Sequence, residues 1–177
     1  MTPLVSLRPA TEEEDLAFLS ALARDPAVEP FLAPGRGEPE ALRELPSTEP
    51  PAGLYLIESP PGRAVGGLAL ALGNRRSRIC ELSRVMLNPA ARGRGIAVAA
   101  VRLAAETALV EHDMHRIQAE VYGDNLAGQR LFERARFTRE GTRRRAYWRR
   151  ERWLDGVLYG LLAEELRHPA PSTGSPP

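Results

Sequence analysis

The residues best suited to chemistry form a glycine-rich turn at positions 92–97, which read Arg-Gly-Arg-Gly-Ile-Ala. This turn stands between a strand expected over Ile79–Leu87 and a helix expected over roughly Arg94–Val110. The first turn of a helix leaves backbone N–H groups without carbonyl partners, and the helix macrodipole attracts anions to that end. Gly93 and Gly95 carry no Cβ, so a phosphate can approach the backbone closely, and the flanking arginines add positive charge. In outline this is a pyrophosphate-binding turn.

Two familiar phosphate motifs do not fit the turn. The P-loop of nucleoside triphosphatases requires GxxxxGK[ST], whereas this chain contains no lysine. The dinucleotide-binding fingerprint requires GxGxxG, and Val98 occupies the place of its third glycine. The pattern that remains is Arg-x-x-Gly-x-Ala over residues 92–97.

Length and composition describe one domain of 177 residues with a formal net charge of +1. This near balance provides no overall attraction to nucleic acid or to membranes. No apolar run reaches the ~18 residues of a membrane-spanning helix, and no signal-peptide pattern is present, so a cytoplasmic protein is expected. The single cysteine, Cys80, excludes an internal disulfide and a cysteine-based zinc site, and is interpreted as a small buried hydrophobe. His112 and His115 lack a third ligand in spacing, so no metal site is expected.

Hydrophobic periodicity predicts a chain in which strands and helices alternate. Besides Ile79–Leu87, strands are expected at Val5–Arg8, Leu54–Glu58, Ala64–Leu72, Arg116–Tyr122, Phe137–Gly141 with Ala146–Trp148, and Trp153–Leu162. Besides the helix after the turn, helices are expected from a Thr11–Glu14 capping box to about Arg24, at Glu38–Leu45, from an Asn125 N-cap to Arg134, and near Glu164. This order indicates an α/β protein with a mixed sheet, with residues 1–167 as one domain and 168–177 as a disordered tail.

Several segments of the chain resemble the GNAT N-acetyltransferase superfamily. Residues 92–97 match that family's [Q/R]xxGx[G/A] signature. Further segments similar to family motifs follow in the family's order at 7–16, 88–97, 115–121 and 125–133. Residues 137–141 and 155–162 resemble the branch that acetylates N-termini of ribosomal proteins. The likeness covers about residues 4–166 and implies the GNAT fold, a mostly antiparallel sheet of about six to seven strands flanked by about four helices.

The same resemblance implies roles for particular residues. The pyrophosphate of acetyl-CoA, the expected co-substrate, would be held by the backbone of Arg92, Gly93, Arg94, Gly95, Ile96 and Ala97. The backbone of Met86 and Leu87 would pair with the pantetheine arm and polarise the thioester carbonyl. Asn125 matches the family asparagine that contacts the cofactor arm, and it can cap its helix at the same time.

The candidate general base is Glu81, eleven residues before Arg92 on the strand that leads to the turn. This spacing resembles that of the glutamate base in histone-acetylating members, and a strand carboxylate with access to water can accept an amine proton. The alternative is a solvated glutamate or an ion-pair partner of a nearby arginine. Near pH 7.4 roughly a quarter of α-amino groups but only about 0.1% of lysines are neutral, so an α-amine acceptor needs little help from a base.

The proton donor for the departing thiolate stays open. Many GNAT enzymes carry a tyrosine where this chain has Phe132, and the N-terminal-acetylating branch often has a serine at the place of Gly128. Arg136 also replaces a glycine that is common in the family. Tyr122, Tyr159 or water could supply the proton instead.

Residues 143–152 are the most charged stretch and contain six arginines with Tyr147 and Trp148 among them. Such a segment could bind RNA, a ribosome or an acidic substrate. It could equally be a solvated hairpin whose arginine stems cover apolar surface. The near-zero net charge favours the second interpretation, so a nucleic-acid partner is not expected.

The sequence therefore predicts an acetyl-CoA-dependent N-acetyltransferase acting on a primary amine. The acceptor could be a protein N-terminus or a small amine such as an antibiotic, an amino acid or a polyamine. The alternative function is a non-catalytic GNAT-fold module that senses acyl-CoA or docks on RNA. The acceptor, the length of the acyl chain and the oligomeric state, including a homodimer, stay open.

Overall fold

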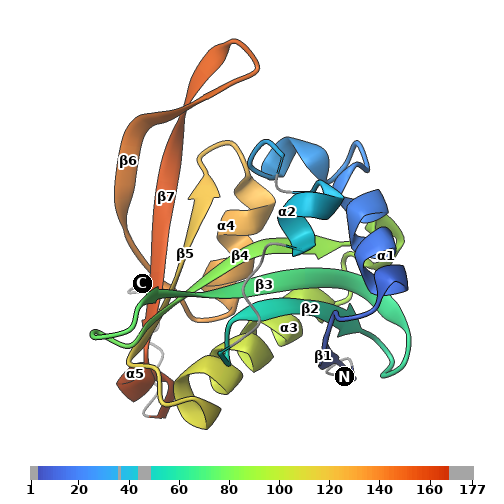
Figure 1. Cartoon of the computed structure of the whole chain (residues 1–177). Helices are drawn as coiled ribbons and strands as arrows, with labels where there is room; N and C mark the ends of the chain where they lie inside the picture. Colours follow the sequence, from blue (N-terminus) through green and yellow to red (C-terminus); the bar gives the residue numbers. More distant parts are fainter. Residues whose placement is uncertain (1–3, 36, 44–48, 168–177) are drawn as a thin grey trace, which may run out of the picture.

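The computed structural model describes residues 4–35, 37–43 and 49–167 of the chain. In these residues seven strands form one sheet in the order β1-β2-β3-β4-β5-β7-β6 (Figure 1). The strands are β1 (Ser6–Pro9), β2 (Gly53–Glu58), β3 (Ala64–Asn74), β4 (Ile79–Leu87), β5 (Arg116–Tyr122), β6 (Thr138–Arg149) and β7 (Arg152–Leu162). Neighbours β4 and β5 run parallel, and the other described pairs are antiparallel.

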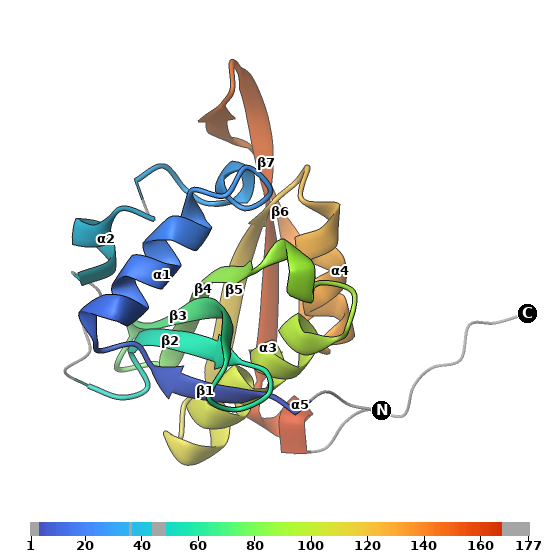
Figure 2. The ribbon, with the colours of Figure 1, turned by 90° about the vertical axis from the view of Figure 1, so that its right-hand side faces the viewer.

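Helices cover both faces of the sheet (Figure 2). The described α-helices are α1 (Glu13–Ala23), α2 (Pro39–Arg43), α3 (Ile96–Glu106), α4 (Leu126–Arg134) and α5 (Ala163–Arg167). Helices α1 and α2 pack on one face and share a core with β2, β3 and β4. Helix α3, its π-helical continuation Thr107–Glu111 and α4 pack on the other face. None of the described helices is long and apolar enough to cross a membrane.

Small apolar residues bring α3 close to the sheet. Ala100, Ala104 and Ala105 have no exposed surface, and Val101 is equally buried. These positions recur at three- and four-residue steps, so they fall on one face of the helix. Because alanine adds little bulk, the α3 axis lies near the strands and its first turn reaches the end of β4.

A β-bulge parts β4 from β5. The two strands are paired from their starts only as far as Glu81 and Gln118, although both continue beyond those residues. On the other side of β4, the register with β3 shifts so that Arg84 and Val85 both stand opposite Leu68. Arg84 adopts a left-handed φ of 51°. A bulge of this kind bends its strand, and the sheet therefore opens between β4 and β5.

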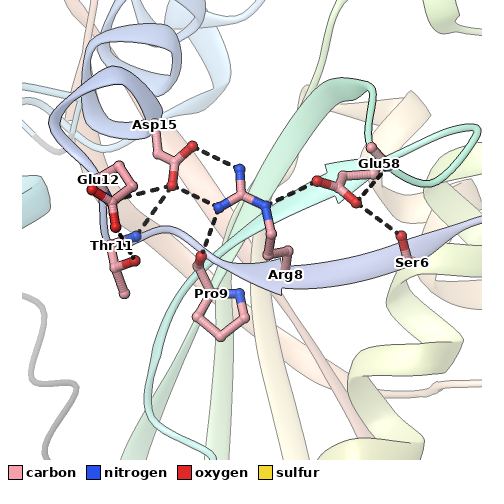
Figure 3. Close-up of polar contacts among 8 residues, drawn as sticks. Ser6, Arg8, Pro9, Thr11, Glu12, Asp15 and Glu58 are labelled. Atoms are coloured by element: carbon pink, nitrogen blue, oxygen red, sulfur yellow. Dashed lines mark hydrogen bonds and ion pairs between the residues drawn. The ribbon is translucent and has the colours of Figure 1, made fainter.

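The start of α1 differs from prediction by one residue. The predicted capping box was Thr11 with Glu14, whereas the observed N-cap is Glu12 and its capping-box partner is Asp15. The Asp15 carboxylate accepts hydrogen bonds from the backbone N–H groups of Thr11 and Glu12 at 3.2 and 3.3 Å. Arg8 of β1 donates two further hydrogen bonds to Asp15 at 2.9 and 2.8 Å (Figure 3). This ion pair holds the Asp15 carboxylate beside the backbone of the N-cap Glu12.

The α/β fold with a mixed, mostly antiparallel sheet of six to seven strands and about four flanking helices is confirmed, with five α-helices among the described residues. Helix α3 begins at Ile96, two residues later than expected, because Gly95 is its N-cap. The predicted break in the penultimate strand is a register shift within a continuous β6. Cys80 is fully buried, and burial raises the pKa of its thiol to about 12. The predicted helix end at 44–45 and the tail at 168–177 lie outside the described residues.

Candidate active site

The first part of the candidate site is the glycine turn at residues 92–97. Gly93 and Gly95 both have a φ of 76°, a left-handed conformation that residues with a Cβ rarely adopt. Space around Gly93 is open, since an added Cβ there would meet no heavy atom within 4 Å. The first backbone hydrogen bond after the turn runs from the Ala99 N–H to the Gly95 carbonyl at 3.0 Å. The N–H groups of Ile96 and Ala97 precede that bond and have no carbonyl one turn earlier in the helix. The left-handed glycines and the helix start expected at this turn are thus present.

The two arginines of the turn have different surroundings. Arg92 donates from Nε to the Leu87 carbonyl at 3.3 Å and from Nη2 to the Ala27 carbonyl at 3.0 Å. Its guanidinium therefore ties the turn to the end of β4 and to the α1–α2 loop. The Arg94 side chain lines a separate cavity of about 220 Å³ beside Asn88. The Arg94 side chain is therefore placed away from the groove described next, whereas the role predicted for this residue concerns its backbone.

A groove of about 480 Å³ runs between the parted ends of β4 and β5. Its walls come from the α1–α2 loop, from the second half of β4, from the start of α3, and from the end of β5 with α4. Most of the predicted site residues line it: Met86, Leu87, Arg92, Gly93, Gly95, Ile96, Ala97, Tyr122 and Asn125. The fold thus joins the glycine turn to a second cluster of polar side chains some thirty residues later in the chain.

Asn125 caps α4 as predicted. Its Oδ1 accepts a hydrogen bond from the Gly128 N–H at 2.9 Å. A Cβ at position 128 would come within 2.6 Å of Asn125 Nδ2 and 2.9 Å of Val121 Cγ1. The close approach of the cap therefore explains why this chain has glycine where the resemblance suggested serine. Arg136, at the other end of α4, adopts the left-handed φ of 71° that favours the expected glycine.

Glu81 does not line the groove. It lies at the last paired position of β4 and β5, and its Oε1 accepts a hydrogen bond from Gln118 Nε2 at 3.2 Å. The side chain leans toward β3, where a Cβ added to Gly73 would come within 3.0 Å of Glu81 Oε1. The structure therefore places the predicted base outside the groove, because the strands separate only beyond it.

Tyr159 is also placed away from the groove. It has no exposed surface, and its hydroxyl donates to Glu133 Oε1 at 3.2 Å. Burial, followed by this hydrogen bond, raises the pKa of the Tyr159 hydroxyl. Its ring stacks on Phe132, with centroids 5.6 Å apart and planes inclined by 21°. Tyr159 is a core residue in this arrangement, and of the two predicted tyrosines Tyr122 is the one that lines the groove.

Tyr122 lies where the groove meets the β6–β7 hairpin. Its ring packs edge-on against Tyr147, with centroids 5.1 Å apart and an interplanar angle of 74°. The guanidinium carbon of Arg149 lies 5.5 Å from the Tyr122 ring centroid, a cation–π arrangement. Two residues of the hairpin therefore hold the Tyr122 ring.

Glu120 is a groove residue that the sequence analysis missed. Arg143 forms an ion pair with it at 3.3 Å, and burial followed by a hydrogen bond to Glu120 raises the pKa of Tyr147. A Cβ at Gly156 would come within 2.0 Å of Glu120 Oε1. The carboxylate therefore occupies the space that a side chain at position 156 would need. Glu120 precedes Tyr122 by two residues on β5, and the alternation of strand side chains could have indicated that the two share a face.

Two further arginines, Arg130 and Arg134, line the groove from α4 and were also missed. They are four residues apart and therefore lie on one face of the helix. This spacing could have indicated from the sequence that the two side chains act together. Arg102 of α3 donates from Nη2 to the Arg134 carbonyl at 2.7 Å and so connects the ends of the two helices. These side chains add positive charge to the wall that faces the glycine turn.

Three carboxylates at the hairpin end are paired with hairpin arginines. Besides the pair of Glu120 with Arg143, Glu29 of the α1–α2 loop lies 3.7 Å from Arg149 and 3.5 Å from Arg150. Asp124 accepts from Arg152 at 2.6 Å. The hairpin thus neutralises the acidic groups around this end. Among the described residues, no group of three or more potential ligands could hold a metal ion.

Comparison with known proteins gives consistent results. The profile of the family described as acetyltransferase (GNAT) domain matches residues 5–138. The "Probable N-acetyltransferase YjcK" of Bacillus subtilis is 37% identical over 76 residues, which cover 43% of this chain and 42% of that protein.

Similar solved structures extend over nearly the whole chain. The spermidine N-acetyltransferase from Vibrio cholerae in complex with CoA and spermine aligns with a TM-score of 0.79 and 20% identity, covering 92% of this chain and 98% of that one. Mycobacterium smegmatis RimJ in complex with CoA-disulfide aligns with a TM-score of 0.75 and 24% identity, covering 92% and 83%. At these identities the likeness concerns the fold.

Proposed function

Since the chain belongs to the acetyltransferase (GNAT) family and is therefore an acyltransferase, we propose that it transfers an acetyl group from acetyl-CoA to an α-amine. One observation carries this proposal: the groove between β4 and β5 connects the glycine turn with Glu120 and Tyr122. A helix N-terminus suited to an anion and two side chains able to transfer protons thus line one cavity. The distance between them is spanned by apolar side chains such as Met86 and Leu131.

The residues present suit acetyl-CoA. The start of α3 would hold the pyrophosphate through the N–H groups of Ile96 and Ala97. Arg130 and Arg134 would add charge for the remaining phosphate. Because β4 leaves β5 after Glu81, the backbone edge of the second half of β4 faces the groove and would bond to the pantetheine amides. The Asn125 amide stands beside that path.

Glu120 and Tyr122 would handle the protons of the reaction. Glu120 accepts the proton that the amine loses as its nitrogen bonds to the acetyl carbon. Tyr122 donates a proton to sulfur as the carbon–sulfur bond breaks. Arg143 and Tyr147 hold the Glu120 carboxylate in place, and Arg149 holds the Tyr122 ring. General acid and base groups at such positions typically contribute about 10²–10⁴-fold each.

The charge pairing at the hairpin end favours an acceptor with one amine over a polycation. Glu29, Glu120 and Asp124 each already pair with an arginine of the hairpin. A polyamine would have to displace those guanidinium groups to gain its own ion pairs. An α-amine, roughly a quarter neutral near pH 7.4, needs only a proton acceptor. We therefore place a protein N-terminus or an amino acid ahead of a polyamine as acceptor.

The experiment is a turnover assay that follows release of the CoA thiol with three acceptor sets: short peptides with free N-termini, amino acids, and spermidine. Isothermal titration with acetyl-CoA accompanies it. We expect binding together with turnover of α-amines, and spermidine at least about tenfold lower in kcat/KM. Preferred turnover of spermidine would contradict the acceptor class. Binding without turnover across all three sets would identify a non-catalytic acyl-CoA module.

A further inference from the structure

The outer part of the β6–β7 hairpin, defined as residues 143–153, is not accounted for by acetyl transfer. Figures 1 and 2 both show this segment projecting beyond the other strands of the sheet. Its register pairs Tyr147 with Leu154, Trp148 with Trp153, and Arg149 with Arg152.

The two faces of the outer hairpin have different tasks. Side chains alternate along a strand, so Tyr147 and Arg149 share one face and Trp148 points to the other. Tyr147 and Arg149 both contact Tyr122, which lines the groove. Trp148 and its register partner Trp153 therefore lie on the face turned away from the groove.

The tryptophan face is unusually open. Trp148 and Trp153 are each 57% exposed, and their rings meet edge-on with centroids 5.2 Å apart and an interplanar angle of 61°. The edge-on contact stabilises the hairpin, but it leaves most of both indole surfaces in water. Adjacent exposed aromatic side chains mark contact sites more often than single exposed apolar residues do.

Cationic side chains are close to this pair in the sequence. Residues 143–152 contain six arginines and one glutamate, although the whole chain carries a net charge of only +1. Arg144 and Arg145 are exposed and form no ion pair with any residue that the structure describes. The other four arginines pair with Glu120, Glu29 and Asp124, so the positive charge of Arg144 and Arg145 is the part available to a partner.

From this arrangement we propose that the outer hairpin binds single-stranded nucleic acid, with unpaired bases stacking on Trp148 and Trp153 and phosphates contacting Arg144 and Arg145. Exposed aromatic rings beside arginines are the elements by which single strands are bound. A duplex offers phosphates but keeps its bases stacked internally, so it would use only the arginines. This activity is independent of the acetyltransferase reaction.

The chain provides its own probe, because Trp148 and Trp153 are its two tryptophans. A 16-nucleotide RNA without self-complementarity, a DNA of the same sequence and the matching duplex are titrated while tryptophan fluorescence is followed. We expect quenching by both single strands with micromolar affinity at low salt. Affinity should fall about tenfold between about 50 and 200 mM salt, the loss for two to three phosphate contacts.

Variants separate stacking from charge. Trp153→Ala should weaken single-strand binding about tenfold, followed by anisotropy of a labelled strand. R144E with R145E should weaken it at least as much. The control is R76E with R167E, which changes the net charge equally at exposed positions far from the hairpin in the chain. Retained acetyl-CoA binding shows that each variant is folded.

Several outcomes would overturn the proposal. Absence of quenching by any strand, equal affinity for the duplex, or equal loss in the control pair would each do so. Quenching by anionic lipid vesicles but not by RNA would assign the face to a membrane surface. A dimer in sedimentation that Trp153→Ala dissociates, without RNA binding, would assign it to a second copy of the chain.

Discussion

The two halves of the sheet, β1–β4 and β5–β7, contribute to the groove in different ways. The first half offers backbone: the bulged edge of β4 and the helix end after Gly95. The second half offers side chains: Glu120, Tyr122 and two arginines of α4 line the groove, and hairpin arginines contact Glu120 and Tyr122. Backbone groups at a turn are set by a few neighbouring residues, whereas side chains from three separate elements meet only when the sheet is assembled. The contribution of the first half to the groove therefore depends on local structure, and that of the second half depends on tertiary structure.

The ion pairs of the two halves differ in how far they are exposed to solvent. In the first half, Arg8 bridges Asp15 and Glu58, whose side chains are each only 9% exposed (Figure 3). In the second half, the side chains of Glu120 and Asp124 are 25% and 29% exposed, and those of their arginine partners are 61% and 58% exposed, against 44% for Arg8. Water screens exposed pairs strongly, so the first cluster stabilises the fold while the second mainly arranges the site.

Gly95→Glu should have the largest effect and test the backbone side of the comparison. The carboxylate would stand where the pyrophosphate binds, so we expect acetyl-CoA affinity to fall at least about 100-fold by isothermal titration. Gly95→Ala is the matched control, because it introduces the same Cβ at a φ of 76° without the charge. Equal affinities of the two variants would show that the helix end does not hold the phosphates.

Glu120→Gln tests the side-chain half. We expect kcat to fall about 100-fold or more, because the amide cannot accept a proton, with acetyl-CoA affinity unchanged. Glu81→Gln, a carboxylate on the same sheet but outside the groove, should change kcat less than about threefold. If the two variants exchanged these results, Glu81 would be the base.

Tyr122→Phe should lower kcat about tenfold through loss of the proton donor. Because Phe132 also lines the groove, Phe132→Tyr in that background should recover part of the loss. The measurement is kcat at saturating acetyl-CoA for the single and double variants. An unchanged kcat in Tyr122→Phe would mean that water protonates the thiolate.

The smallest effects concern stability and compare the two sets of ion pairs. The hydrogen bond from Arg8 lowers the pKa of Asp15, and the Gly62 N–H followed by Arg8 lowers that of Glu58. Since both pKa values are lower in the folded chain, the stabilisation is present above about pH 4 and is lost as pH falls through the folded values. Asp15→Asn with Glu58→Gln should flatten this acid loss and reduce Tm at pH 7 by about 3 °C.

Asp124→Asn is the control for that measurement in the second half. Its pair with Arg152 is exposed, so Tm should change by less than about 1 °C. Thermal unfolding followed by circular dichroism between pH 3 and 7 compares the variants. An equal loss in both would show that burial does not distinguish the two halves.

The sequence by itself determined the turn, the Asn125 cap and the alternation of the strands. Each depends on residues within a few positions of one another: glycines that accept a left-handed φ, an amide within reach of an N–H three residues on, and a period of two. These features sufficed for the fold and for most residues of the cofactor side.

Only the tertiary structure decided which polar side chains reach the groove. The bulge at Arg84 separates β4 from β5 just beyond Glu81, so the opening lies beside Glu120 and leaves Glu81 outside. Packing against Phe132 buries Tyr159, while the hairpin brings Tyr147 to Tyr122. None of these contacts is local in the chain. They depend on where strands part and on how a hairpin folds back, which is set by the sum of packing across the whole sheet.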